Sequence, residues 1–468
     1  MTRSLRAFKR WMRSQEIDCS DTLAFKEDDQ GILVQAVCDL KEGDLVATIP
    51  KQACLTIKTS VAKELIEETG LDGSLGLSLA LMFEGSLGQE SAWYGYLQVL
   101  PDRECIPLVW SLEEVDALLM GTELHKIVKE DKALLYEDWK ECILPLITSG
   151  SSKLDPSSFG VEQYFAAKSL VTSRAFEIDD FHGSGMVPLA DLFNHKTGAE
   201  NVHFSVSSSS HSDVENEDGN NDVPENNNHK ASSEDAITDS SDDDQTPLEM
   251  IIVREVEAGS EVFNTYGSMG NAALLHRYGF TEPDNPFDIV NIDLELIVQW
   301  SSSSFSKRYS RARLSTWRKL DWSGCVSQNS EYFEISSQGE PQLELLILLH
   351  IICLPEETYH VLNCTQGSSG EYEKSKNILF EGTIGNLPGA QEKRREVLLT
   401  RTVCRALVAL ADIRESLYGP NSLQDDLNAL RSCCIQERKL YHSLVLRVSE
   451  RRILERLRIC ASRSNNRK

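Results

Sequence analysis

Two short stretches of this 468-residue sequence carry polar and aromatic side chains whose spacing could serve chemistry. The first is "VFNTYGSMGNAALLHRYGF", residues 262–280, where Asn264, Tyr266 and Tyr278 interrupt an otherwise apolar run. A plain core segment avoids such groups, because each buried polar group needs a partner or costs stability. Two tyrosines twelve residues apart, beside an Asn-containing turn, suit a narrow polar channel with aromatic walls. An ordinary hairpin exit with half-buried tyrosines explains the pattern equally well.

The second stretch is "SRAFEIDDFHGSGMVPLADLFNHKTGAENVHF", residues 173–204. Within its apolar part, Asp191, Asn194 and His195 stand at positions i, i+3 and i+4. Asp and Asn favour turns and helix caps, so a capped short helix is the structural alternative.

The elements that position these stretches begin with two similar β segments. Residues 31–57 read as strand, turn, strand, with the turn at 41–44. The spacing V-x-x-L-x-x-G-x-x-V at 37–46 recurs as V-x-x-V-x-x-G-x-x-V at 253–262. We therefore predict two hairpins that form one β domain from distant parts of the chain, although hairpins are common enough for the match to arise by chance.

Helical patterns fill most of the remaining sequence. Between the β segments, several stretches have apolar residues near a 3.6-residue period, and "SLEE" at 111–114 predicts a capping box. After Pro286 such stretches follow one another, which predicts an all-α C-terminal domain. The basic start "MTRSLRAFKRWMRSQ" reads as an amphipathic helix, with a transit peptide as the alternative.

Composition limits the classes of protein that the chain can be. The hydrophobic fraction of 41% is that of a globular protein, and no run of eighteen apolar residues is present, so we expect no membrane span. The formal charge of −26 argues against direct nucleic-acid binding. About a dozen of the acids fall in 207–246, which we predict to be a disordered acidic loop, either a tolerated insertion or a docking patch for a basic partner.

Several common catalytic motifs are missing from the sequence. The twelve Cys are scattered, apart from one adjacent pair, and no C-x-x-C occurs, so we expect reduced thiols and no zinc site. No G-x-S-x-G or H-E-x-x-H is present. The glycines at 70–76 and 183–185 lack the strand–loop–helix context of a dinucleotide site. We predict no bound metal.

Several motifs together resemble the SET-domain protein-lysine N-methyltransferases. They are "NTYGSMGNAALLHRYGF", "PLADLFNH", "SRAF", "GILVQAVCDLKEGDLVATIP", "SAWYGYLQVLP" and "RKLYHSLVLRVSERRIL". The resemblance is to the subgroup of the Rubisco large-subunit, ribosomal and NF-κB-type lysine methyltransferases, and it follows nearly the whole chain in order. It implies an α+β class: a SET-type β-fold of small sheets with a helical insert, followed by an all-α C-terminal substrate-binding domain.

The resemblance also implies the bounds of the domains. An N-terminal helix would occupy 1–20 and the SET domain 21–286, with its helical insert at about 60–160 and the acidic loop at about 207–246. The all-helical substrate-binding domain would occupy 291–460, and a basic tail 461–468.

The cofactor implied by the resemblance is S-adenosylmethionine. The arginine of "SRAF" matches one that reaches the carboxylate end of the cofactor, and the Asn-His pair matches a pair that contacts it. The aromatic residues of "RYGF" would pack near the adenine. The implied cofactor-binding residues are Gln30, Gly31, Ile32, Arg174, Asn194, His195, Tyr278 and Phe280.

On the substrate side, the resemblance assigns Asp191, Phe176 and Tyr266, with Tyr266 as the catalytic residue that aligns the lysine amine. A related branch methylates histidine and has a Trp directly before the Asp and an Asn two residues after the Arg. This chain has Ala190 and Phe176 at those places, as lysine-directed members do.

The expected function is therefore methyl transfer from S-adenosylmethionine to a lysine ε-amino group of a protein substrate. The alternatives are a catalytically silent SET-fold adaptor for a basic partner and a protein-histidine methyltransferase. We expect a monomer of the nucleus or cytoplasm, with a plastid location left open, that binds neither membrane nor nucleic acid directly.

Overall fold

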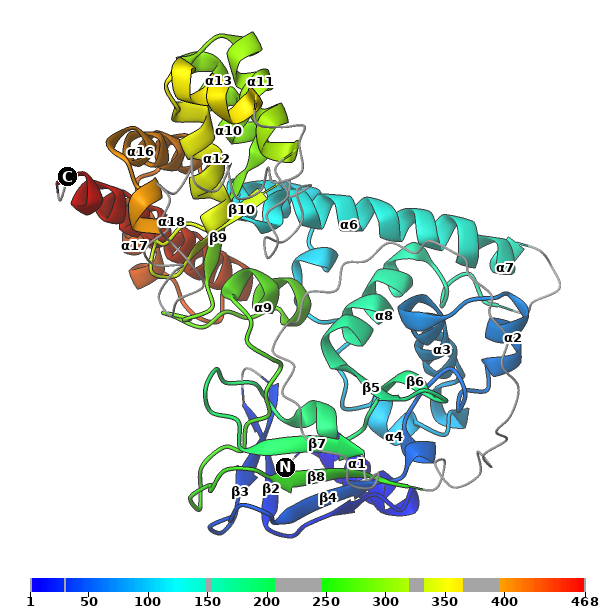
Figure 1. Ribbon diagram of the computed structural model, residues 1–468. Helices are drawn as coiled ribbons and strands as arrows, with labels where there is room; N and C mark the ends of the chain where they lie inside the picture. The colour runs from blue at the N-terminus through cyan, green and yellow to red at the C-terminus, as the bar shows by residue number, and fades with distance from the viewer. Residues whose placement is uncertain are drawn as a thin grey trace, which may run out of the picture. The chain divides into compact units, whose positions relative to one another are not determined.

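The computed structural model describes residues 2–28, 31–148, 154–206, 246–319, 332–364 and 395–466 (Figure 1). The chain forms two compact units. Unit 1 comprises residues 1–103 and 138–266, and unit 2 comprises 104–137 and 267–468. Residues 104–137, which the sequence places in the helical insert, thus belong to unit 2. The domain bounds implied by the resemblance stay a prediction.

A four-stranded antiparallel sheet forms the centre of unit 1. Its strand order is β1 (Asp18–Cys19), β4 (Leu45–Ile49), β8 (Leu248–Ile252) and β7 (Val202–Val206). Figure 1 shows β4, β8 and β7 side by side. In β8 every second residue is buried, as expected for a strand with one face on the core.

The two repeated β segments pair with each other, as predicted for one β domain built from distant parts of the chain. Leu40 and Val256 exchange backbone hydrogen bonds of 2.9 and 3.1 Å, and β4 runs antiparallel to β8. The glycine of each repeat, Gly43 and Gly259, has a positive φ, of 90° and 86°. Only glycine adopts this backbone conformation without strain, which explains why the repeat keeps it.

The prediction that the two strands of residues 31–57 pair with each other is wrong. The strand that begins at Gly31, β3 (Gly31–Ala36), pairs with β2 (Leu23–Asp28), and β4 belongs to the four-stranded sheet. The turn at 41–44 therefore connects two sheets. Both strands fit the same local pattern, but β3 pairs with the strand just before it, whereas β4 pairs with β8, about two hundred residues away.

Helices and a further hairpin complete the described part of unit 1. The helix α3 packs on α8, and α1 packs on α4. The N-terminal stretch is helical, as predicted, with Leu5, Phe8 and Met12 buried on one face. The remaining elements are α1 (Arg3–Ser14), α2 (Lys63–Glu68), α3 (Gly73–Leu87), α4 (Tyr94–Leu97), α7 (Leu144–Thr148), α8 (Val161–Arg174), β5 (Ala175–Asp179) and β6 (Gly183–Met186).

Unit 2 is predominantly helical, as predicted, but it is not wholly so. The strand β9 (Ile289–Asp293) pairs antiparallel with β10 (Tyr332–Ser336), a two-stranded sheet that the sequence analysis missed. The predicted capping box is present, with Ser111 and Glu114 bonded to each other's backbone. The helices are α5 (Leu112–Leu119), α6 (Leu124–Asp138), α9 (Asn271–Tyr278), α10 (Leu294–Ser304), α11 (Lys307–Lys319), α12 (Leu343–Cys353), α13 (Glu356–Cys364), α16 (Arg401–Ser416), α17 (Leu423–Ser432) and α18 (Arg438–Asn466).

The core of unit 2 lies around α12, whose apolar side chains are almost all buried. The basic helix α18 packs along α16 (Figure 1), so one of its faces is covered by protein. Arg447 and Arg451 are buried on it, and both form ion pairs with the buried Asp426, at 3.3 and 2.6 Å. Such pairing is required for charges removed from water. The predicted tail at 461–468 continues α18 as far as Asn466.

Within the described residues, no single helix is long and apolar enough to cross a membrane. The bent pair 343–353 and 356–363 passes that test by length and composition only, and most of α12 is buried in unit 2. Ten cysteines of the described part are free thiols. The predicted acidic loop at 207–246 lies outside the described residues, except for Thr246.

Candidate functional site

Two segments of unit 1 that are far apart in sequence meet at the predicted site. His195 and Asn264 form a parallel β bridge, and the backbone N–H of Asn264 donates to the carbonyl of Asn194 at 2.9 Å. Two residues on, the backbone N–H of Tyr266 donates to Nδ1 of His195 at 3.0 Å. The two polar stretches of the sequence therefore form one site. The contacts between them are backbone bonds, a bond from backbone to the His195 ring and one ring stack.

His195 and Tyr266 form the central pair of this site. Their rings stack with centroids 5.2 Å apart and an angle of 22° between the planes. Because a backbone N–H can only donate, Nδ1 of His195 must be the acceptor, so the neutral ring carries its proton on Nε2. Nε2 lies 3.2 Å from the hydroxyl of Thr197. The ring is therefore fixed in orientation and tautomer.

The hydroxyl of Tyr266 donates to the main-chain carbonyl of Phe193 at 3.0 Å. Phe193 itself is fully buried, so its carbonyl is held by the core while the tyrosine ring is half-buried. The bond fixes the position of the phenol oxygen. That oxygen retains lone pairs that can accept a further hydrogen bond.

Asp191 lies in a short 3₁₀ turn, Ala190–Leu192, which comes just before Phe193, Asn194 and His195 in the chain. The residue before this turn, Leu189, has a φ of +79°, which is rare for a side chain other than glycine and costs conformational energy. The side chain of Asp191 is fully buried. A buried carboxylate needs strong partners, and Asp191 finds them on two helices.

The first partner is Arg174, the last residue of α8. Its Nη1 donates to the carboxylate Oδ2 of Asp191 at 3.2 Å and to the main-chain carbonyl of the same residue at 3.1 Å. The second partner is Tyr96 on α4, whose hydroxyl donates to Oδ2 at 2.9 Å. The residue types and spacings of the sequence did not identify Tyr96 as a site residue. The only sequence signal was its place in "SAWYGYLQVLP", which is a stretch that carries the family resemblance.

Of the predicted cofactor residues of unit 1, His195 is buried, whereas Gly31, Ile32, Arg174 and Asn194 are exposed or half-buried. The amide of Asn194 is exposed, and its Nδ2 donates to Glu261 at 2.8 Å. Gly31 and Ile32 begin β3, and a Cβ added at Gly31 would meet no atom within 4 Å. Gln30 lies outside the described residues. The structure thus shows an open backbone at Gly31, and the cofactor roles stay predictions.

The remaining predicted residues are aromatic. Phe176, on β5, packs against Phe204 of β7 with ring centroids 5.0 Å apart. Tyr278 and Phe280 lie in unit 2, with centroids 6.3 Å apart, and burial raises the pKa of the Tyr278 hydroxyl. Their contact with the adenine therefore stays a prediction. Ala190 is fully buried.

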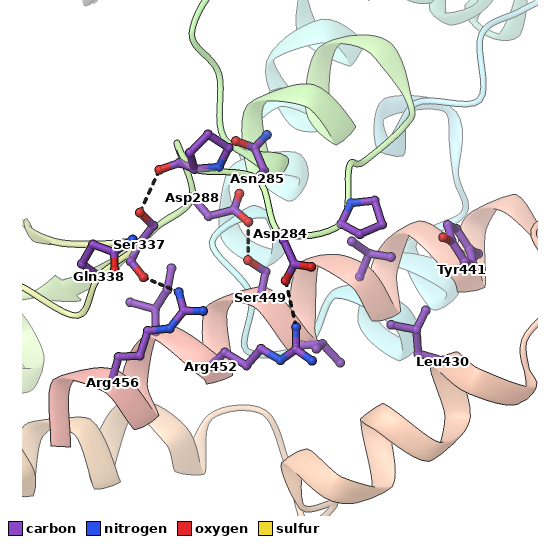
Figure 2. Close-up of a pocket in the computed structure, with 15 residues that line it drawn as sticks. Asp284, Asn285, Asp288, Ser337, Gln338, Leu430, Tyr441, Ser449, Arg452 and Arg456 are labelled. Carbon is purple, nitrogen blue, oxygen red and sulfur yellow. Dashed lines mark hydrogen bonds and ion pairs between the residues drawn. The ribbon is translucent and has the colours of Figure 1, made fainter. Parts of the chain in front are cut away.

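A separate hollow of about 220 Å³ lies in unit 2 between the 283–288 loop, α17 and α18 (Figure 2). Charged groups line it, but they have partners within the lining. Arg452 forms an ion pair with Asp284 at 3.2 Å, and Arg456 donates to the main-chain carbonyl of Ser337. Since cations and carboxylates are balanced, the hollow favours no class of charged ligand, and we assign none to it. No group of three His, Cys, Asp or Glu that could hold a metal occurs in the described part of the chain.

Comparison with known proteins shows what the chain is similar to. No model of a known protein family matches the chain. The N-lysine methyltransferase setd6 of Danio rerio is 25% identical over 488 aligned positions, which cover 97% of this chain and 94% of that protein. Ribosomal lysine N-methyltransferase 3 of Saccharomyces cerevisiae is 26% identical over 328 positions, which cover 56% of this chain and 59% of that protein.

Solved structures agree with these relatives. The structure of Rubisco LSMT bound to AdoMet matches with a TM-score of 0.65 at 17% identity, over 100% of this chain and 93% of that chain. The SET domain of LSMT bound to MeLysine and AdoHcy matches with the same TM-score at 18% identity and the same coverage. The chain therefore has the SET fold. Its sequence is similar along most of its length to proteins named N-lysine methyltransferase setd6, and over about half of its length to ribosomal lysine N-methyltransferase 3.

Proposed function

We propose that this protein transfers a methyl group from S-adenosylmethionine to the ε-amino group of a lysine in a protein substrate. Relatives along nearly the whole chain are named N-lysine methyltransferases, and structures with the same fold contain AdoMet or AdoHcy with methyllysine. The observation in this chain that carries the proposal is the paired 194–195 and 264–266 segments. They stack His195 on Tyr266 and fix the tyrosine hydroxyl on the carbonyl of Phe193.

The donor side of the site fits S-adenosylmethionine, which supplies an electrophilic methyl group on a sulfonium. The exposed backbone at Gly31 has open space where a side chain would stand, so the main chain can approach a ligand. Asn194 and His195 would contact the donor from the opposite segment. Arg174 would face its carboxylate, a task for which the planar guanidinium is suited.

On the acceptor side, Tyr266 would orient the lysine amine. A free lysine amine has a pKa near ~10.4, and only its neutral form has a lone pair that can attack a methyl group. The hydroxyl proton of Tyr266 is directed to Phe193, so its oxygen can accept an N–H of the amine. The lone pair of the amine would then face the methyl carbon, so that a nitrogen–carbon bond forms while the carbon–sulfur bond of the donor breaks. The protein contributes position and electrostatics to this step.

The first experiment is titration calorimetry of the purified chain with S-adenosylmethionine, beside Asn194→Ala. We expect saturable binding by the wild type and a loss of at least tenfold in the variant, since a ligand contact and the bond to Glu261 are both removed. Asn428→Ala, an exposed asparagine of α17, is the matched control and should bind as the wild type does. Failure of a folded wild type to bind contradicts the proposal.

The finer parts of the proposal concern the acceptor and the location. We propose lysine as the acceptor, because the residue before Asp191 is the small, buried Ala190 and the residue two after Arg174 is Phe176. The histidine-directed branch has Trp and Asn at these two places. Mass mapping of proteins methylated in an extract checks this, and methyl groups found on histidine would contradict it. We propose the nucleus or cytoplasm as the location, and a fluorescent fusion confined to plastids would contradict that.

A further inference from the structure

Tyr96 connects the predicted site to a part of the fold far from it in sequence. The side chain is fully buried on α4, and its hydroxyl donates to Oδ2 of Asp191, 95 residues away. Burial, and then the charge of Asp191, raise the pKa of Tyr96 well above its ordinary value. The phenol therefore keeps its proton at physiological pH and acts as a donor.

The same carboxylate oxygen also accepts from Arg174, so two donors on different helices converge on one buried atom. Removing either donor would leave the charge of Asp191 less compensated, which is costly because this side chain is fully buried. Asp191 begins the segment that continues through the carbonyl of Phe193 to Asn194 and His195. Its position therefore sets the position of the groups that follow.

The N-terminal helix α1 fixes Tyr96 from the other side. The indole of Trp11 stacks on the Tyr96 ring, with centroids 6.1 Å apart and an angle of 21°, and its N–H donates to the carbonyl of Ala92 at 2.7 Å. Phe8 packs on the same ring at 6.2 Å. The residue before Tyr96 on α4 is Gly95, where an added Cβ would fall 2.3 Å from Cβ of Trp11. The side chain of Trp11 on α1 therefore packs directly against the backbone of α4 at Gly95.

We propose that Tyr96 is a positioning residue of the methyl-transfer site, which holds Asp191 and through it Arg174 and residues 190–195, and that α1 is the support that keeps Tyr96 in place. This inference rests on the proposed function. It assigns to α1, which the sequence shows only as an amphipathic helix, a role in the geometry of the site.

A double-mutant cycle tests the proposal, with the dissociation constant for S-adenosylmethionine measured by calorimetry and the thermal midpoint measured in parallel. Tyr96→Phe keeps the stacked ring and removes only the hydroxyl, and we expect it to raise the dissociation constant about tenfold. In an Asp191→Asn background the same change should have less than about a twofold effect, because residues that act through one partner are not additive. Tyr164→Phe is the control. Tyr164 is a buried residue of α8 whose hydroxyl has no partner among the described residues, and this variant should bind as the wild type does.

Binding by Tyr96→Phe equal to the wild type, or an equal loss in both backgrounds, overturns the proposal. Trp11→Phe tests the support from α1 separately, because it removes the indole N–H and leaves Tyr96 intact. We expect a smaller rise in the dissociation constant, and unchanged binding overturns that part. A folded wild type that does not bind S-adenosylmethionine contradicts the proposed function itself, which distinguishes the two failures.

Discussion

At the scale of single residues, the site depends on which polar groups fix one another. Arg174, Asp191, His195 and Tyr266 are each held by a bond to another part of unit 1. These bonds fix the residues before any ligand arrives. Such preorganisation is what a transfer reaction without a covalent intermediate requires, because position is the main contribution of the protein.

The hydroxyl of Tyr266 gives the sharpest residue-scale prediction. Tyr266→Phe keeps the stack on His195 and removes the hydroxyl that bonds to Phe193. S-adenosylmethionine should therefore still bind, while the lysine amine loses the group that orients it. We expect turnover to fall about 100-fold or more, the usual cost of losing the alignment of an attacking group. Single-turnover transfer of a radiolabelled methyl group measures it.

Tyr94→Phe, a half-buried tyrosine on α4, controls for the loss of a phenol and should keep wild-type turnover. Full activity in Tyr266→Phe would remove the catalytic assignment and leave the fold untouched.

At the scale of elements, α1 and α4 are joined more closely than their sequences suggest. The half-buried Trp11 packs over Gly95, which leaves no room for a side chain there. The amphipathic pattern of α1 predicts that it packs on something, but it does not specify its partner.

Gly95→Ala should therefore destabilise the protein. The added methyl group would overlap the Cβ of Trp11, which cannot rotate away, so α1 must shift. We expect a loss of about 1–3 kcal/mol in the free energy of unfolding, the usual cost of overpacking. Urea unfolding followed by circular dichroism measures it.

Gly85→Ala is the matched control, because Gly85 is in α3 and nothing lies within 4 Å of the added atom. It should be neutral or stabilise the protein by about 0.5–1 kcal/mol, through the better helix propensity of alanine. Equal effects of the two substitutions would show that α1 is not held tightly on α4.

At the scale of the whole molecule, both units bury polar side chains, and burial makes stability depend on pH. In unit 2 the ring of His442 is buried and its Nδ1 lies 3.1 Å from the backbone N–H of Thr281, which donates to it. Burial, and then the charge of Arg438, lower the pKa of His442 to about 4, from an ordinary 6.5. The folded protein therefore holds this histidine neutral, whereas the unfolded chain binds a proton below pH 6.5.

This linkage predicts the direction of the pH dependence. The contribution of His442 is fully present above pH 6.5 and is lost as the pH falls towards 4, up to about 3 kcal/mol. His442→Gln should reduce this slope in unfolding measurements between pH 7 and 4. The exposed His203, on β7 of unit 1, gives the control His203→Gln, which should leave the slope as it is. An unchanged slope in His442→Gln would contradict the prediction.

The sequence by itself determined the local elements and the chemical groups of the site. Local patterns predicted the strands that begin at Gly31 and Leu45, most helices and the capping box at Ser111, because these depend on residues near one another in the chain. It also marked Asp191, Asn194, His195 and Tyr266 as polar groups that an apolar segment would not carry without partners. The matched 37–46 and 253–262 repeats predicted that distant parts of the chain form one β domain.

Only the tertiary structure decided which of these groups meet. It separated β3 from β4, added the β9–β10 pair, and placed Tyr96 on Asp191. Apart from its place in a stretch that carries the family resemblance, nothing in the sequence distinguishes Tyr96 from a core tyrosine, because its contacts are with a carboxylate 95 residues away and with α1. Hydrogen bonds and ring contacts act over a few ångströms of space. Sequence patterns show such contacts only when the partners are also neighbours along the chain.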